Sequence, residues 1–165
     1  MLFLWLHLTR KYFKRHRMKV NTKVRYGLRV MVELALDEKK VGIFQKDIAK
    51  KQDISFKYLD QIIAGLKSSG LISTVSGKKS GYRLTRNPDV ITVLDVYNAF
   101  NPEFAVVDCL IDDENCKKYN KCATRGFWEG LNSTLVKYMR STTINDLAQK
   151  QKELDQEPQE LIFHI

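Results

Sequence analysis

Between residues 44 and 86 the sequence has the pattern of two short helices joined by a polar turn and followed by a β-hairpin. The first helix is predicted over 44–50, with the turn at Gln52-Asp53. The second helix is predicted from about Ser55 to Ser69, because its apolar residues recur at steps of three and four and therefore share one face. These residues are Tyr58, Leu59, Ile62, Ile63 and Leu66. Gly70 then stands where a glycine commonly ends a helix.

A two-stranded wing is predicted directly after this glycine. Leu71–Val75 is rich in β-branched residues, 76–81 is a turn containing glycines and lysines, and Tyr82–Thr85 returns as the partner strand. Two helices joined by a tight turn can place the second in a DNA major groove while a β-wing reaches the adjacent backbone. The pattern therefore predicts a winged helix-turn-helix. An ordinary helical hairpin beside a surface hairpin is the alternative.

Basic residues are concentrated in the same part of the chain. Residues 18–87 contain 15 Lys and Arg against 6 Asp and Glu, whereas residues 88–165 contain 8 against 13. Lysine and arginine side chains near phosphates release counterions, which supplies most of the non-specific affinity for DNA. This distribution favours double-stranded DNA as the partner of the first half of the chain.

Length and composition indicate one domain with an extension. The chain has 165 residues, of which 44% are hydrophobic, and this is enough to bury a core. No apolar run reaches the ~18 residues that a membrane span requires, so no membrane partner is expected. Three cysteines are an odd number, which argues against a disulfide framework and favours a cytoplasmic protein with reduced thiols.

Residues 1–17 differ from the rest of the chain. A short apolar patch is followed by a basic stretch, which is the reverse of the order in a secretory signal. We interpret these residues as a misassigned or disordered extension before a true start at Met18. A helix lying on a membrane surface is the alternative.

Two further helices are predicted around this unit. One runs from Asn21 or Thr22 to about Asp37 and carries Arg25, which is placed either to approach a phosphate or to lie on a solvated cationic face. The other covers Val93 to Phe100, with Thr92 as its capping residue.

Cys109, Cys116 and Cys122 follow in a polar stretch that is typical of a loop. Cysteines in such a loop have no apolar surroundings to explain them as core residues. Three thiolates this close can converge on one metal, either as ligands of an iron–sulfur cluster or as ligands of zinc. A thiol redox switch and inert thiols are the other interpretations.

The order of these motifs resembles the Rrf2 family of bacterial transcription regulators, over residues 18 to about 148. The resemblance is carried by the start of the first helix, the two helix-turn-helix segments, the wing and the cysteines: Met18–Gly27, Asp47-Ile48-Ala49, Ile54-Ser55, Tyr58–Gln61, Leu66, Gly70-Leu71, Gly81–Leu84, Ile91–Val93 and the three cysteines.

This resemblance implies a homodimer that binds a palindromic operator as a repressor or an activator. DNA-contacting positions would be Ser55, Lys57, Tyr58, Asp60, Gln61 and Arg83, with Gly81 allowing close approach of the wing. The residue pattern adds Arg25, Lys78 and Lys79 as phosphate contacts, and Asp60 either accepts a hydrogen bond from a cytosine or only rejects other bases.

The resemblance also implies a 2Fe–2S or 4Fe–4S cluster on Cys109, Cys116 and Cys122. The fourth ligand departs from the family pattern. IscR-like members have a histidine three residues beyond the third cysteine, where this chain has Arg125. NsrR-like members use an aspartate of the first helix, where this chain has Arg25.

The expected architecture is mainly α with a small β-wing, and it includes a long dimerisation helix. The expected divisions are 18–101 for DNA binding, 102–124 for the cysteine loop, 125–148 for dimerisation helices and 149–165 for a polar tail. An enzyme is not expected, because no histidine lies near the cysteines to act as a base. The remaining alternatives are the same regulator with structural zinc or a thiol switch, and a protein-interaction module that does not bind DNA.

Overall fold

The computed structural model describes residues 20–37, 39, 41–75, 81–111 and 118–156. The expectations for residues 1–17, Lys78, Lys79, Cys116 and the end of the polar tail lie outside these residues. The elements are α1 (Thr22–Ala35), α2 (Gln45–Gln52), α3 (Phe56–Ser68), β1 (Ile72–Thr74), β2 (Tyr82–Leu84), η2 (Pro88–Val90), α4 (Val93–Asn98), η3 (Asp108–Leu110), η4 (Tyr119–Lys121), α5 (Arg125–Ser141) and α6 (Ile144–Gln156).

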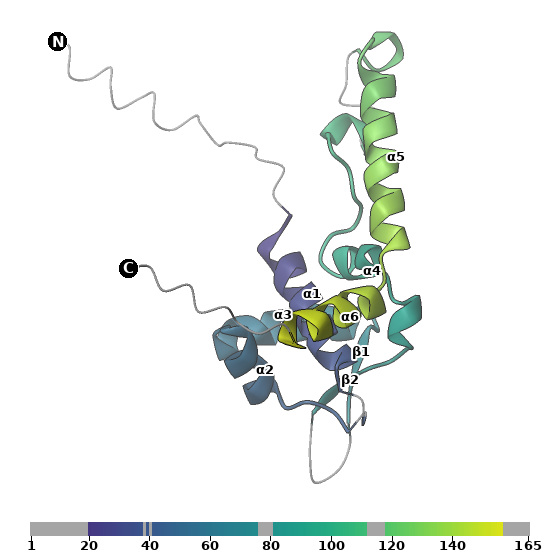
Figure 1. Ribbon diagram of the computed structural model, residues 1–165. Helices are drawn as coiled ribbons and strands as arrows, with labels where there is room; N and C mark the ends of the chain where they lie inside the picture. Colours follow the sequence, from purple (N-terminus) through teal and green to yellow (C-terminus); the bar gives the residue numbers. More distant parts are fainter. Residues whose placement is uncertain (1–19, 38, 40, 76–80, 112–117, 157–165) are drawn as a thin grey trace, which may run out of the picture.

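Helix α1 is the central support of the fold, and α2, α3, α4 and α6 all pack against it (Figure 1). Asn21 caps its N-terminus by accepting a hydrogen bond from the Lys23 amide at 2.9 Å. The buried face of α1 includes Val30 and Met31, both fully inaccessible to solvent. Sequence periodicity placed this helix correctly, although it ends at Ala35 rather than near Asp37.

The predicted helix-turn-helix is confirmed. Helix α2 ends at Gln52, and Asp53 forms the turn with a left-handed φ of 50°. Three residues, 53–55, separate α2 from α3, and Gln52, which was predicted to lie in the turn, is the last residue of α2. The left-handed Asp53 reverses the chain directly after the helix. Ser55 then caps α3 by accepting the Tyr58 amide at 3.3 Å, and Gly70 ends the helix with φ 71°.

The wing is an antiparallel pair in which Ile72, Ser73 and Thr74 face Leu84, Arg83 and Tyr82. A third backbone segment, which no sequence pattern indicates, lies beside this pair. Ile43 forms an isolated bridge with Tyr82, with N–H···O distances of 3.0 and 2.9 Å. Gly81 is buried against this segment, and a β-carbon there would lie 2.9 Å from backbone atoms of Gly42 and Ile43. The glycine is thus required by packing within the protein.

Phe100 follows α4 and lies between two helices. β-Carbons added at Gly27 of α1 and Gly65 of α3 would each lie 2.5 Å from its ring. Helix α4 itself begins with the predicted cap: the Thr92 hydroxyl accepts the Asp95 amide at 3.1 Å, and the Asp95 carboxylate accepts the Thr92 amide at 2.8 Å. The chain that leaves α4 is therefore anchored between α1 and the second helix of the helix-turn-helix.

Helices α5 and α6 differ in their packing. Helix α5 has no buried residue and extends away from the body of the fold, whereas α6 packs against α1 (Figure 1). Ile144 and Ala148 of α6 belong to the buried residues. We call α5 the arm. Two backbone hydrogen bonds join its base to the start of α4: the Val93 amide donates to the Thr142 carbonyl at 2.9 Å, and the Ile144 amide donates to the Ile91 carbonyl at 2.8 Å.

The chain from residue 149 was expected to be a polar tail beyond the helices, and for Gln149–Gln156 this expectation is wrong. Helix α6 continues through it to Gln156. Two pairs along the helix support these turns: Lys150 with Glu153 at 2.9 Å and Gln151 with Asp155 at 2.8 Å. Polar composition alone did not reveal that the apolar start of the helix is held against α1.

Candidate nucleic-acid interface

One face of α3 is buried and the opposite face is exposed. Leu59, Ile62 and Leu66 are fully buried, which fixes the orientation of the helix on the core. The exposed side chains include Ser55, Phe56, Lys57, Asp60, Gln61 and Lys67. All the predicted DNA-contacting residues of this segment are therefore exposed except Tyr58, which is half-buried.

Tyr58 connects α3 to a cationic patch on α1. Its ring meets the Tyr26 ring edge-on, with centroids 5.7 Å apart. The guanidinium groups of Arg25 and Arg29 lie 5.2 and 5.5 Å from the centroid of the Tyr26 ring. Arg25 is itself exposed, so the structure brings this predicted phosphate contact close to the N-terminal part of α3.

Asp60 is tied to the rest of the candidate interface through Gln45. The Gln45 amide nitrogen donates to the Asp60 carboxylate, and the Tyr82 hydroxyl donates to the Gln45 amide oxygen at 3.4 Å. This chain joins α3, the start of α2 and the wing. Gln45 was not singled out from the sequence, because only the folded arrangement brings it between two predicted contacts.

Arg83 of β2 is exposed, as a wing residue that approaches DNA must be. Gly81 is buried, so the reason for its presence is the backbone contact with Gly42 and Ile43 rather than an exposed surface.

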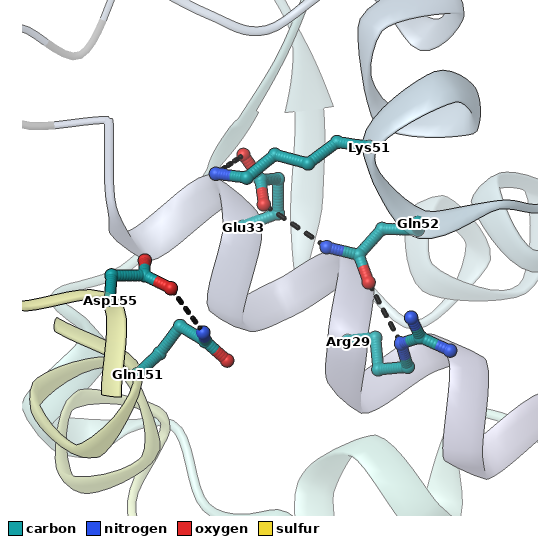
Figure 2. Close-up of polar contacts among 6 residues, drawn as sticks. All are labelled: Arg29, Glu33, Lys51, Gln52, Gln151 and Asp155. Carbon is teal, nitrogen blue, oxygen red and sulfur yellow. Dashed lines mark hydrogen bonds and ion pairs between the residues drawn. The ribbon is translucent and has the colours of Figure 1, made fainter. Parts of the chain in front are cut away.

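A second polar network holds α2 on α1 (Figure 2). Glu33 of α1 is only 7% exposed, and its carboxylate accepts hydrogen bonds from Lys51 Nζ at 2.8 Å and Gln52 Nε2 at 3.1 Å. The Gln52 amide oxygen in turn accepts a hydrogen bond from Arg29 Nε at 2.8 Å. A groove of about 510 Å³ separates this network from α6. The position of α2, against which α3 packs, thus depends on a nearly buried carboxylate.

The two described cysteines flank the segment before α5. Cys109 lies in η3 and Cys122 follows η4, and both are half-buried thiols without a disulfide. The Cys122 sulfur lies 3.3 Å from the Thr124 hydroxyl oxygen. Hydrogen bonds from the Thr124 side chain, then from its backbone, lower the pKa of the Cys122 thiol, with smaller contributions from the Arg125 amide and Lys118.

Arg125, which stands where the family resemblance led us to look for a histidine, is engaged by other side chains. Its guanidinium lies 3.5 Å from the centroid of the Tyr119 ring, donates to the Tyr119 hydroxyl at 2.8 Å and pairs with Glu129 at 2.7 Å. Within the described ranges, which omit Cys116, no group of three His, Cys, Asp or Glu residues is arranged to hold a metal. Three thiols are suitable donors for iron or zinc, whereas Arg125, held by Tyr119 and Glu129, offers no further donor beside them.

The helix-turn-helix, the wing and the exposed basic side chains around α3 define a DNA-binding winged-helix protein. Among the described residues, none of the helices combines the length and apolarity needed to cross a membrane.

Comparison with known proteins identifies the family. Residues 20–150 match the family model described as "Rrf2: Iron-dependent Transcriptional regulator". The chain belongs to the Rrf2 family and is a DNA-binding transcriptional regulator. It is 32% identical over 148 residues to the HTH-type transcriptional regulator CymR of Bacillus subtilis, covering 90% of this chain and 100% of CymR. It is 30% identical over 138 residues to IscR of Xenorhabdus nematophila, covering 84% of each chain.

Solved structures of the same family share the fold. The structure of B. subtilis CymR, described as the global cysteine regulator of that organism, gives a TM-score of 0.69 at 31% identity, covering 81% of this chain and 98% of CymR. T. potens IscR gives 0.68 at 30% identity, covering 86% and 93%. These relatives are transcriptional regulators, so the prediction that the chain is not an enzyme is confirmed.

Proposed function

We propose that this regulator binds a palindromic operator as a homodimer and that an iron–sulfur cluster on Cys109, Cys116 and Cys122 controls its affinity. The main supporting observation is that two surfaces occur in one chain: an exposed, polar face of α3, called here the reading face, and the apolar side of α5, a helix without buried residues. In this proposal α5 forms the contact between the two subunits, and the reading face of α3 contacts the operator DNA.

The proposed dimer contact is the apolar side of α5. Phe127 is 64% exposed and Tyr138 is 70% exposed, and four half-buried apolar side chains lie between or beside them: Trp128, Leu131, Leu135 and Met139. A continuous apolar surface of this kind usually marks a protein–protein contact. A second copy of the chain offers the same apolar surface, so two copies can pair symmetrically through α5. The two winged helices of such a dimer are related by a twofold axis, which matches the symmetry of a palindromic site.

The proposed DNA contacts come from three elements. Helix α3 supplies Ser55, Lys57, Asp60 and Gln61 to base edges, and Tyr58 to a phosphate. Arg25 of α1 and the wing residues Lys78, Lys79 and Arg83 contact phosphates. Gly81 supports the wing from within the protein.

The cluster proposal is supported by the donor chemistry of the three thiols and by the family description. Sulfur ligands suit a 2Fe–2S or a 4Fe–4S cluster, which when bound supplies a group that responds to oxidants and to iron supply. In this chain the cysteine loop begins a few residues after Phe100, whose ring lies between α1 and α3. A rearranged loop therefore has a direct mechanical route to the reading helix.

The test is anaerobic purification of the full chain, followed by an absorption spectrum and measurement of iron, sulfide and zinc per chain. Iron and sulfide in matching amounts, with visible bands that disappear in Cys122→Ala, are the expected result. Stoichiometric zinc would replace the cluster with a structural site. No metal after attempted reconstitution would leave a thiol switch on the same DNA-binding regulator.

Operator binding is tested separately. Wild-type protein is used to select binding sites from random duplex DNA, and the selected site is then titrated anaerobically with wild type, Cys122→Ala and the control Lys137→Ala. A palindromic site whose affinity changes only in Cys122→Ala supports the sensor. Failure to enrich any site would favour a protein-interaction module instead.

A further inference from the structure

Phe56 is a large apolar side chain on the candidate reading surface. It is the first residue of α3, directly after the capping residue Ser55, and it is 53% exposed. Helical spacing would place it beside Leu59 and Ile63 on the buried face. It stays exposed because it lies in the first turn, where helical side chains lean toward the N-terminus and beyond the core.

The structure gives Phe56 no packing role. It belongs neither to the core cluster nor to the hydrophobic side chains packed against that cluster. In the part of the chain that the structure describes, Phe56 takes part in no aromatic pair or cation–π contact, unlike Tyr26, Tyr58 and Phe44. Its exposed neighbours Ser55, Lys57 and Asp60 are polar or charged, so Phe56 is an apolar point within a polar surface.

The location of Phe56 limits what it can contact. In helix-turn-helix proteins the N-terminal residues of the second helix meet base edges in the major groove. The one apolar group displayed there is the 5-methyl of thymine, and side chains such as Phe recognise it by apolar contact. The neighbouring polar groups offer nothing to a methyl, since Lys57 suits guanine and Gln61 suits adenine.

We infer that Phe56 contacts the 5-methyl group of a thymine in each operator half-site and is a sequence-determining residue of this regulator. This inference rests on the proposed function, because it requires α3 to enter a major groove. It also assigns a base preference to a residue outside the polar set that the sequence identified.

Deoxyuridine provides the test, because it pairs as thymine does but lacks only the methyl group. The operator selected by the wild-type protein is resynthesised with each thymine pair, one per half-site, replaced in turn by deoxyuridine. We expect one position at which the substitution weakens wild-type binding, by about fourfold per half-site for the loss of one buried methyl. Phe56→Ala should bind the unmodified operator correspondingly more weakly and show no further loss with deoxyuridine at that position.

Lys57→Ala is the matched control, since it changes the adjacent exposed residue of the same turn. It should weaken binding while keeping the deoxyuridine effect. Because Phe56 is exposed, Phe56→Ala should keep the wild-type unfolding midpoint and helical circular dichroism, which separates a lost contact from a lost fold.

Three results would overturn the inference alone while leaving operator binding intact. These are an operator without a fixed thymine, wild-type affinity that is indifferent to deoxyuridine at every thymine, and a deoxyuridine effect that is unchanged in Phe56→Ala. If no site is enriched from random DNA, the proposed function fails, and the inference that depends on it fails as well.

Discussion

The ring of Phe100 fills the space beside Gly65, so that a β-carbon at residue 65 would lie 2.5 Å from Cε1 of Phe100. The opposite edge of the ring lies against Gly27 of α1, where an added β-carbon would be equally close. The ring therefore has little room to move away from residue 65. The Phe100 ring, wedged between these two glycines, thus connects the segment that leads to the cysteines with both α1 and α3.

Gly65→Ala should therefore destabilise the protein. Alanine is better than glycine by about 1 kcal/mol in a helix interior, but overpacking a fixed ring costs about 1–3 kcal/mol. We expect a net loss of about 1 kcal/mol in urea unfolding, relieved when Phe100→Leu is added. The control is Gly130→Ala on α5, where a β-carbon meets nothing within 4 Å. Equal stabilisation by both alanines would contradict the wedge.

Gly81→Ala should lower the free energy of unfolding by more than the loss of glycine's backbone freedom explains. The β-carbon would lie 2.9 Å from backbone atoms of Gly42 and Ile43, and backbone yields less easily than a side chain. We expect a loss of about 2 kcal/mol or more in stability and weaker operator binding through a displaced wing. Gly70→Ala is the comparison, since its φ of 71° is strained in open space and should cost about 1 kcal/mol. A smaller effect at 81 than at 70 would reject the packing argument.

Tyr138→Glu should separate the proposed dimer. Tyr138 is 70% exposed, so the monomer fold should tolerate the change, whereas a buried charge in a subunit contact is costly. Light scattering should show a shift to monomer, and operator affinity should fall at equal protein concentration. Lys137→Glu, an adjacent exposed change on another side of α5, should leave the mass at that of a dimer. If the wild-type protein is itself monomeric, α5 has another partner.

The Glu33 network predicts that removing Lys51 and removing Glu33 destabilise the protein by different amounts. The Lys51 side chain is 55% exposed, and Glu33 keeps its hydrogen bond from Gln52 when Lys51 is removed, so Lys51→Ala should cost less than Glu33→Ala. Glu33→Ala removes two hydrogen bonds between α1 and α2 and leaves space in a nearly buried site, at a cost of about 1–3 kcal/mol. Thermal or urea unfolding of both variants is the measurement. Equal costs would mean that the exposed ion pair, rather than the buried carboxylate, holds α2.

Asp146 predicts a pH dependence at the start of α6. Hydrogen bonds from the Thr143 backbone and then its side chain lower the pKa of the Asp146 carboxyl below its ordinary value of 3.8. The folded state binds the proton less tightly than the unfolded state, so the stabilisation is present above pH ~4 and is lost as pH falls through the lowered pKa. Carboxyl titration by NMR should show the low value, and Thr143→Val should raise it partway. An unchanged titration in Thr143→Val would assign the shift to the backbone alone.

The helix-turn-helix and the wing were predictable because their signals are local. Periodicity located the buried face of α3, and Gly70 marked its end through a left-handed conformation that glycine adopts readily. The contacts that organise the interface are not local. Gln45 meets Asp60 and Tyr82 only after folding, and the Ile43 bridge leaves no sequence pattern because a single bridging residue has no period.

The cysteine region was predictable only in part. Polar composition predicted a loop around Cys109 and Cys122, whereas Cys109 lies in the short 3₁₀ helix η3 and Cys122 directly follows η4. It also did not show that Arg125 is engaged by Tyr119 and Glu129. The continuation of α6 to Gln156 was missed for a related reason. Polar helices are stabilised by what their apolar end packs against, and that surface is supplied by α1, more than a hundred residues earlier in the chain.

The backbone hydrogen bonds at the base of α5 determine how this helix is attached to the rest of the fold. Helix α5 has 17 residues, so its cysteine-proximal end stands about 25 Å from its base. Two stretches of the chain join that end to the body: the segment that leaves the body after Phe100, and α5 itself, which leads back to Ile144. The two attachments are neighbours in the fold, because backbone hydrogen bonds join Val93 to Thr142 and Ile144 to Ile91. Helix α5 is thus attached to the core at one place, where α4 and α6 both pack against α1.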